Sequence, residues 1–409
     1  MEVILQIEFK NMHDSDTLYG MIIIMSSSKR RDILLAMVPY SPWRAEGIRR
    51  FAREAGWNLL EWSSLPGIGG WCGDGAIVTI RNDPELVALV RRLRRRGVPV
   101  VDMTNEHPEI KVPRVCLDNR AIGRMAAEHF AERNFRHAAW FSTHWIPTHA
   151  ARFASFSEVW TSLPGGREPP SRHVLMEEIP ASRWNDSRAV GRWFASLLRK
   201  APKQLAVFCP GAAEASRIIN ECRIAGVSVP EEVAVLCTGD DQMPCENQAV
   251  PISCIIVGGE RQGYEAAALL NRLIDDEPPP KKPITMPPKG IVVRASTDMV
   301  AASDPLVAKA LRLVAENLSR PWGVAQLCAA LGVAPRRLCR RFTAELGRSP
   351  GEEILRQRMA KARKLLGDTD LPLHEVAAQC GLCHASYLSN LFRRETGLSP
   401  RAWRKMHED

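Results

Sequence analysis

The stretch CGLCHASYLSNLFRRETGLSP, residues 380–400, has a divergent copy earlier in the chain, LGVAPRRLCRRFTAELGRSP, residues 331–350. In both copies a glycine precedes a segment in which apolar residues recur three and four positions apart, as Leu388 and Phe392 do. Glycine permits the left-handed backbone that ends a helix sharply, and the apolar spacing predicts another helix after the turn. Each copy is therefore expected to form a helix, a tight turn and a second helix, the unit that places its second helix in the major groove of DNA.

The segment between the two copies predicts one amphipathic helix over residues 351–366. A single helix in this place would fix the spacing between two DNA-reading units. Its inward positions are expected to be Leu355, Met359, Ala362, Leu365 and Leu366.

The net charge of +9 is concentrated in this C-terminal part of the chain. Residues 306–409 carry 18 Lys and Arg against 10 Asp and Glu, so they account for +8 of the total. A near-neutral body with a basic terminal module indicates that the module meets a polyanion, most commonly nucleic acid.

Cys380, Cys383 and His384 also match C-x-x-C-H, the pattern of c-type haem attachment, and the thiols could instead bind a metal or form a disulfide. The sequence has no second C-x-x-C for a four-ligand zinc site. The only early apolar run, GMIIIM at 20–25, is too short for an export signal or a membrane span. We therefore expect a cytoplasmic protein with reduced cysteines, no cofactor and no metal site, in which Cys380 is a packing residue. A metal or haem sensor at C-x-x-C-H is the alternative.

From residue 33 to about residue 260, short apolar runs alternate with amphipathic segments. This alternation is typical of parallel sheets that are covered on both faces. The expected fold class is a two-lobed α/β domain, with sheets over roughly 33–135 and 136–260, followed by an all-α domain with two helix-turn-helix units. The proline-rich stretch 275–290 is expected to be a stiff surface excursion. The expected strands are 33–38, 75–80, 98–103, 112–118, 137–142, 205–209, 233–239, 252–257 and 290–294, and the expected helices include 43–55, 84–96, 119–134, 185–200, 212–225 and 259–275.

Four segments are expected: an irregular tail over 1–31, a two-lobed effector-binding domain over 32–298, a linker over 299–305 and a DNA-binding domain over 306–409. The α/β part has no G-x-G-x-x-G after a strand, no P-loop lysine and no G-x-S-x-G turn. An enzyme is therefore not expected.

The two copies, extended to LCAALGVAPRRLCRRFTAELGRSP (327–350) and LHEVAAQCGLCHASYLSNLFRRETGLSPRAWR (373–404), resemble the AraC-type DNA-binding domain. Leu382 and Leu388 stand where that family usually has aromatic residues, and both remain apolar. The positions that carry the resemblance in the second unit are Ala377, Cys380, Gly381, Tyr387, Phe392, Gly397, Pro400 and Arg404.

The resemblance implies which side chains face DNA. Arginine pairs with guanine O6 and N7, asparagine pairs with adenine N6 and N7, and small apolar side chains contact the thymine methyl. Arg337 and Arg341 are expected to contact phosphates, which position a protein without specifying a sequence. The implied base-reading residues are Arg336, Cys339 and Arg340 in the first unit and Ala385, Ser386, Ser389 and Asn390 in the second.

The stretches VPVVDMTNE (98–106), VCLDNRAIGRMAAEHFAERNFRHAAWFS (115–142) and AGVSVPEEVAVLCTGDDQ (225–242) are similar to the two-lobed effector domain of LacI-type repressors and periplasmic sugar-binding proteins. Joined to an AraC-type domain, such an effector domain is typical of regulators of xylose operons. Pro210 and Ala212 follow a strand where sugar-binding relatives usually have Asn or Asp. This departure leaves the identity of the sugar open.

A sugar site needs carboxylates, Asn and Arg for hydrogen bonds and an aromatic plane for stacking. The similarity implies Arg152 and Asp240 as ligand-binding residues, with Asp118 and Asn119 beside the hinge. Asp118 and Asn119 could instead only cap the helix near residue 120. Two aromatic residues in the loop after the first expected strand are candidates for stacking, Tyr40 and Trp43, and Trp43 could instead belong to the core.

We therefore expect a sequence-specific transcription regulator, and an activator, controlled by xylose or a related sugar. Closure of the lobes on the ligand is expected to change how a homodimer presents its helix-turn-helix units to double-stranded DNA. Contact with RNA polymerase is expected, and contact with a membrane is not. The alternative from another class is a sugar-binding receptor without specific DNA binding.

Overall fold

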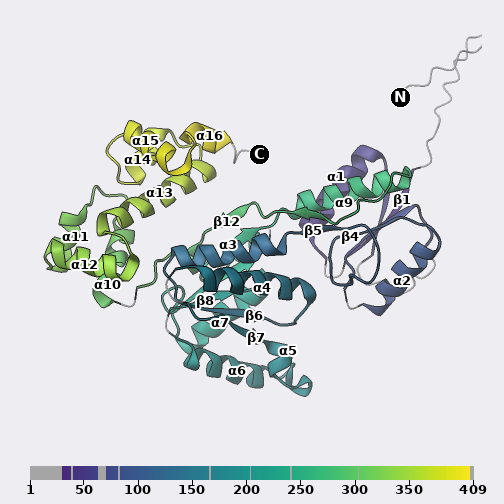
Figure 1. The fold of residues 1–409 in the computed structure, drawn as a ribbon, viewed down its shortest axis with the longest axis horizontal. Helices are drawn as coiled ribbons and strands as arrows, with labels where there is room; N and C mark the ends of the chain where they lie inside the picture. Colours follow the sequence, from purple (N-terminus) through teal and green to yellow (C-terminus); the bar gives the residue numbers. More distant parts are fainter. Residues whose placement is uncertain are drawn as a thin grey trace, which may run out of the picture.

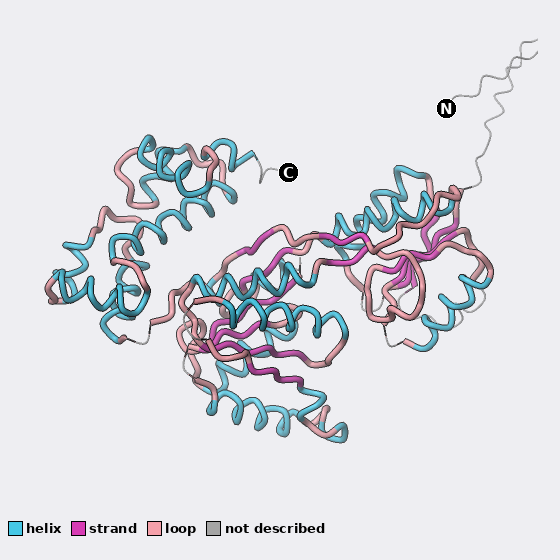
Figure 2. The backbone as a smooth tube through the Cα atoms, viewed as in Figure 1, coloured by secondary structure: helices cyan, strands magenta, loops and turns pink. Residues whose placement is uncertain are grey.

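The computed structural model describes residues 30–37, 40–62, 71–81, 83–164, 167–202, 204–239, 242–302 and 304–405. Within these residues, two α/β lobes are followed by a helical part (Figures 1 and 2). The predicted fold class is therefore confirmed. Among the described helices none is long and apolar enough to cross a membrane.

The first lobe is a parallel sheet in the order β2-β1-β3-β4. Successive side chains of a strand point to opposite faces of the sheet. In β1, Ile33 and Leu35 therefore face one apolar core, and Leu34 and Ala36 face another. Helices α1 and α9 cover the first face and α2 covers the second. The elements are β1 (Asp32–Ala36), α1 (Pro42–Ala55), β2 (Asn58–Trp62), β3 (Gly75–Val78), α2 (Pro84–Arg95), β4 (Val100–Asp102) and α9 (Gly259–Ile274).

The second lobe is a six-stranded sheet in the order β12-β10-β9-β8-β6-β7, in which only β12 is antiparallel to its neighbour. Helices α3 and α4 pack on one face, and α6 and α7 pack on the other. The strands are β6 (His137–Ser142), β7 (Ser171–Val174), β8 (Leu205–Phe208), β9 (Val233–Thr238), β10 (Ser253–Ile256) and β12 (Gly290–Val292). The helices are α3 (Asn119–Glu132), α4 (Pro147–Ser162), α5 (Leu175–Glu178), α6 (Ser187–Lys200), α7 (Ala212–Ala225) and α8 (Gln242–Glu246).

The chain passes between the lobes three times. It crosses after β5 (Val115–Leu117), returns after β10 to form α9 on the first lobe, and crosses again between β11 (Ile284–Met286) and β12 (Figure 1). Strands β5 and β11 pair with each other in parallel. The sequence predicted that the proline-rich stretch 275–290 is a surface excursion. The stretch also contains strand β11, which pairs on one side only, and proline is tolerated in such a strand.

The helical part has two separate hydrophobic cores, one for each predicted unit. Helix α13 contributes Ile354 to the first core and Met359 and Ala362 to the second, so it joins the two units as predicted. The helices are α10 (Pro305–Glu316), α11 (Val324–Leu331), α12 (Pro335–Leu346), α13 (Pro350–Asp368), α14 (Leu373–Gln379), α15 (Ala385–Thr396) and α16 (Pro400–Lys405).

Candidate nucleic-acid interface and effector site

Helices α12 and α15 follow the glycine turns that the sequence predicted. Gly332 and Gly381 both adopt the left-handed conformation, with φ of 66° and 65°. Each helix buries a Leu and a Phe one turn apart on one face, Leu338 with Phe342 in α12, and exposes most of the opposite face. An exposed helix face held by a tight turn has the geometry that enters a major groove.

The exposed face of α12 is strongly basic. Arg336, Arg337 and Arg340 are exposed, and none of them pairs with a carboxylate of the described residues. Arg341 differs, because its Nη1 lies 2.5 Å from a carboxylate oxygen of Asp304, the residue that caps α10. Cys339 is half-buried. Three of the four predicted arginines are thus available to DNA, and Arg341 is held by the start of α10.

The first two turns of α15 expose a polar and uncharged face, and the exposed Arg393 and Arg394 follow in its last turn. Ser386 and Asn390 are exposed, while Ala385 and Ser389 are half-buried. Tyr387, which the resemblance placed on this helix without a role, is 51% exposed between them. The two predicted reading helices therefore offer different chemistry, arginines in the first and neutral hydrogen-bonding groups in the second.

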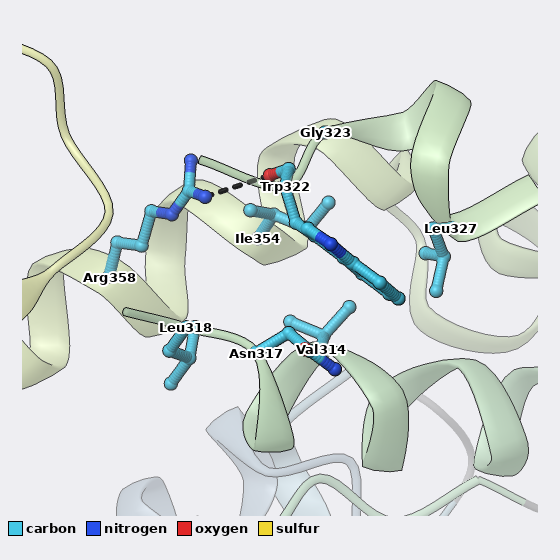
Figure 3. A pocket seen from close by; sticks show the side chains of 8 residues that line it. All are labelled: Val314, Asn317, Leu318, Trp322, Gly323, Leu327, Ile354 and Arg358. Carbon is cyan, nitrogen blue, oxygen red and sulfur yellow. Dashed lines mark hydrogen bonds between the residues drawn. The ribbon is translucent and has the colours of Figure 1, made fainter. Parts of the chain in front are cut away.

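The two units are fastened to each other through α13 and the segment before α11. Arg358 on α13 donates hydrogen bonds to the carbonyl oxygens of Arg320, at 2.8 Å, and Trp322, at 2.7 Å. Figure 3 shows Arg358 pointing to Trp322, which lines a small hollow together with Val314 and other residues of the first unit. The spacing of the two reading helices is therefore fixed by hydrogen bonds as well as by a shared helix.

The structure separates the three residues of the C-x-x-C-H motif. Cys380 is fully buried in the core of the second unit, and burial raises the pKa of its thiol to about 11. Cys383 and His384 are exposed. Cys380 thus packs as predicted, and its sulfur faces the core while the other two side chains face solvent.

Arg152 on α4 is the centre of the candidate effector site. It is only 6% exposed, and it donates hydrogen bonds to Asn119 Oδ1 at 2.7 Å, Thr238 Oγ1 at 2.7 Å and the Pro210 carbonyl at 3.3 Å. All three acceptors are neutral, and no carboxylate among the described residues pairs with it. A buried cation without an acid is costly unless a ligand supplies the anion.

Two arginines of the first lobe lie near Arg152. Burial, together with the positive charges of Arg44 and Arg81, lowers the pKa of Arg152 to about 10. Glu106 is the neighbouring acid: its carboxylate lies 3.6 Å from Arg81 Nε, and burial raises its pKa. We call Arg44, Arg81 and Arg152 the interlobe arginine site, because its members come from both lobes.

The other predicted ligand residues are placed differently. Asn119 contacts Arg152, whereas Asp118 caps α3 by accepting a hydrogen bond from the Ala121 amide at 2.9 Å. Tyr40 accepts a hydrogen bond from Arg49, which pairs with Glu61 on β2, so its hydroxyl is held on the α1–β2 side. Trp43 is exposed rather than part of the core. Asp240 lies outside the described residues.

Sequence reasoning missed Arg44, Arg81 and Thr238. Thr238 ends β9, Arg81 follows the end of β3, and Arg44 lies in the first turn of α1, the helix that follows β1. Ligands of α/β sheets bind beyond the carboxyl ends of the strands, so position relative to the strands was the available signal. That rule would have added all three residues to the candidate site.

His149, next to Arg152 on α4, predicts an acid-sensitive stability. Burial lowers the pKa of His149 to about 4, and the charge of Arg152 contributes, whereas an unfolded histidine titrates near 6.5. The neutral ring therefore stabilises the fold fully above pH 6.5, and this stability is lost as the pH falls from about 6.5 to about 4. Between pH 7 and pH 5 the loss should be about 2 kcal/mol.

His149→Asn provides the comparison, because an asparagine amide can still donate to the His144 carbonyl that the imidazole Nδ1 contacts at 3.0 Å. The unfolding free energy of the variant should depend less on pH than that of the wild type over this range. Equal pH dependence of both proteins would contradict the assignment.

Helix α3 connects this site to the DNA-binding part. Asn119 at its start binds Arg152, and at its end Arg133 donates to the Thr297 carbonyl at 3.0 Å and accepts from the Ala301 amide at 2.7 Å. The charges of Glu353 and Arg356 on α13 lie close enough to Arg133 to affect its pKa. Val300 and Ala302, in the predicted linker, belong to the core of the first unit. One rigid helix thus spans from the arginine site to the junction.

Comparisons with known proteins agree with this architecture. Residues 327–406 match a helix-turn-helix domain family, and residues 127–297 match a periplasmic binding protein-like domain family. The xylose operon regulatory protein of Escherichia coli strain K12 is 25% identical over 84% of this chain and 86% of its own.

Solved structures with the same fold include a xylose-binding transcription activator and a transcriptional regulator in complex with cellobiose. The first has a TM-score of 0.58 and 23% identity, and covers 93% of this chain and 99% of its own. The second has a TM-score of 0.52 and 23% identity, and covers 65% of this chain and 85% of its own. The shared fold thus extends over both the α/β lobes and the helical part.

Proposed function

Because the chain is an AraC-type helix-turn-helix transcription regulator with a periplasmic-binding-protein-like domain, homologous to the xylose operon regulators and not an enzyme, we propose that a ligand at the interlobe arginine site controls how α12 and α15 bind a promoter. The observation that carries this proposal is the buried guanidinium of Arg152, whose hydrogen-bond acceptors among the described residues are all neutral.

The ligand we propose is a sugar that carries a carboxylate or a phosphate. Among the described residues Arg152 has only neutral acceptors, so an anionic group on the ligand would form charge-assisted hydrogen bonds with its guanidinium. Xylose, which is neutral, is the second candidate, supported by the names of the similar regulators. Asp240, Tyr40 and Trp43 remain proposed contacts for the hydroxyls and the ring.

A thermal-shift comparison of neutral and anionic sugars with the full chain tests the ligand class. Suitable pairs are xylose and xylonate, glucose and glucuronate, and glucose and glucose 6-phosphate. A ligand at a hundred times its Kd adds about 2.7 kcal/mol of stability, so the anionic member of one pair should raise the melting temperature and its neutral partner should not. A shift with xylose alone would establish the second candidate instead.

Arg152→Met should abolish the shift, because it removes the buried charge and all three hydrogen bonds. The control is Arg120→Met, an exposed arginine on α3 whose nearest acid is Glu158 at 3.6 Å. A ligand shift that survives in the Arg152 variant would place the effector elsewhere.

Helix α3 is the element that we propose transmits the ligand signal. A ligand that draws Arg44 and Arg81 toward Arg152 would close the lobes. This closure would change the contact between Arg152 and Asn119, at the start of α3. The far end of α3 holds residues 297–301 and lies beside α13, which joins the two reading units. Only a ligand with different affinity for the open and closed lobes can shift this equilibrium.

For DNA reading, the prediction concerns Arg340. Arg340→Ala should weaken binding to the preferred operator by about 1 to 3 kcal/mol and relax specificity at one base position. Arg337→Ala, the matched substitution at a proposed phosphate contact, should weaken binding to all sequences. It should also reduce the slope of log affinity against log salt concentration by about one. Selection of bound sequences in vitro, followed by affinity measurements on the selected operator, distinguishes the two. Uniform loss with the Arg340 variant would make it a phosphate contact.

We also propose that the protein acts in the cytoplasm as a homodimer that activates transcription through contact with RNA polymerase. The receptor alternative predicts ligand binding with no preferred DNA sequence. The same in vitro selection tests it, because a receptor would enrich no operator.

A further inference from the structure

Three cysteines outside the C-x-x-C-H motif converge in the second lobe. The Sγ atoms of Cys237, Cys245 and Cys254 all lie within 4.8 Å of one another. The residues are 0%, 1% and 2% exposed, respectively. Among the described residues this is the one group of three cysteine, histidine or acidic side chains close enough to share a metal ion.

Strand register brings the first two together. Cys237 on β9 and Cys254 on β10 are direct partners across neighbouring parallel strands, so their side chains point to the same face of the sheet. Cys245 comes from the short helix α8 above that face, where a hydrogen bond of 2.8 Å from the Ile252 amide to the Cys245 carbonyl holds it. Arg294 also anchors α8, because its guanidinium lies 3.0 Å from Glu246.

We propose that these three thiols form a binding site for a soft metal ion of the copper(I) class. A metal–thiolate bond of about 2.3 Å puts two sulfurs roughly 3.8 Å apart in a tetrahedral site and about 4.0 Å apart in a trigonal one. The sulfurs of Cys237 and Cys245 are 3.8 Å apart. The spacing therefore suits a metal without rearrangement of the backbone, whereas a disulfide bond of about 2.05 Å would require the two sulfurs to approach each other.

The donor set selects the class of ion. Sulfur-only sites favour copper(I) and zinc over magnesium or calcium, and zinc in a structural site takes four ligands, of which this group supplies three. Copper(I) is satisfied by three thiolates, and each thiolate that forms releases one proton. The thiol of Cys254, which now donates to the Gly239 carbonyl at 2.9 Å, would turn to the metal.

Other buried cysteines provide the comparison within the same core. Cys209 and Cys222 are fully buried beside the group and belong to the same hydrophobic cluster, but neither is part of the three-sulfur arrangement. If burial alone explained the cysteines of this lobe, substitution of Cys222 and Cys245 should have equal effects on metal binding.

The test is an anaerobic titration of the reduced full chain with copper(I) in the presence of a coloured competing chelator. The wild type should hold one equivalent against the chelator. Cys245→Ser should lose it, while Cys222→Ser, and Cys383→Ser as an exposed-thiol control, should retain it. Circular dichroism of each variant shows whether it folds, and Cys237→Ala provides a second substitution within the site.

Retention of the equivalent by the Cys245 variant, or its absence from the wild type, would overturn the proposal. So would tight binding of zinc in preference to copper(I), which would assign a different class of ion. Formation of a disulfide between Cys237 and Cys245 in air, combined with no copper binding, would replace the metal site with a redox pair. None of these outcomes depends on the effector or on DNA.

Discussion

Gly263→Ala is expected to destabilise the first lobe by about 3 kcal/mol, because there is no room for a methyl group between helices α1 and α9. A Cβ atom at Gly263 would lie 2.0 Å from the carbonyl oxygen of Arg44. The reverse contact is equally tight, since a Cβ at Gly47 would lie 1.8 Å from the carbonyl oxygen of Glu260. These are backbone atoms, so only separation of the two helices relieves the clash.

Separation of α1 and α9 would also affect the effector site, because it would displace Arg44, a member of the interlobe arginine site. We therefore expect Gly263→Ala to lower the melting temperature and to weaken the effector-induced shift. Gly191→Ala is the matched control, because this glycine lies within α6 and no atom lies within 4 Å of its Cβ position. Alanine at this position should increase the free energy of unfolding by up to about 1 kcal/mol. Wild-type stability of the Gly263 variant would show that the helices can part without cost.

Gly381→Ala should lower the free energy of unfolding several times more than Gly332→Ala does, although the two glycines occupy equivalent turns. Both have φ near +65°, where a non-glycine residue costs about 1 to 2 kcal/mol. A Cβ at Gly332 would meet nothing within 4 Å, whereas one at Gly381 would lie 2.4 Å from the Arg320 carbonyl oxygen and 2.5 Å from that of Leu318. The second turn therefore packs directly against the backbone of the first unit.

The Gly381 variant should lose the fixed spacing of α12 and α15, and with it at least tenfold in affinity for an operator that contains both half-sites, which corresponds to about 1.4 kcal/mol. Binding to a single half-site read by α12 should be less affected. Equal losses with Gly332→Ala and Gly381→Ala, in thermal unfolding and in operator binding, would show that the contact with Leu318 and Arg320 contributes nothing.

The helix-turn-helix units were predictable because their signals are local. A glycine and apolar residues three and four positions apart determine a turn and a helix without reference to distant residues. Strand β2 was missed because it is an edge strand with a mostly exposed NLLEW sequence. Helix α4 was missed because its core-facing side includes polar residues, among them His149, Arg152 and Ser155.

The sites divide in the same way. The DNA-facing residues follow from one helix each, whereas the effector site combines Arg44, Arg81 and Arg152 from three separate elements. Arg152 was identified through family resemblance, and its two arginine neighbours required knowledge of where the strands end. The cysteine group required the register of β9 and β10, which no spacing in the sequence reveals.

The three crossings between the lobes set the order in which the protein can be completed during synthesis. Helix α1 packs against α9, and their contacts include Arg50 and Glu260, which are separated by 210 residues. At about 5 to 20 residues per second, the ribosome needs roughly 10 to 40 s to deliver this partner, and the apolar face of α1 lacks it until then. The DNA-binding helices emerge after both lobes, so a nascent chain can bind a promoter only once both lobes have been synthesised.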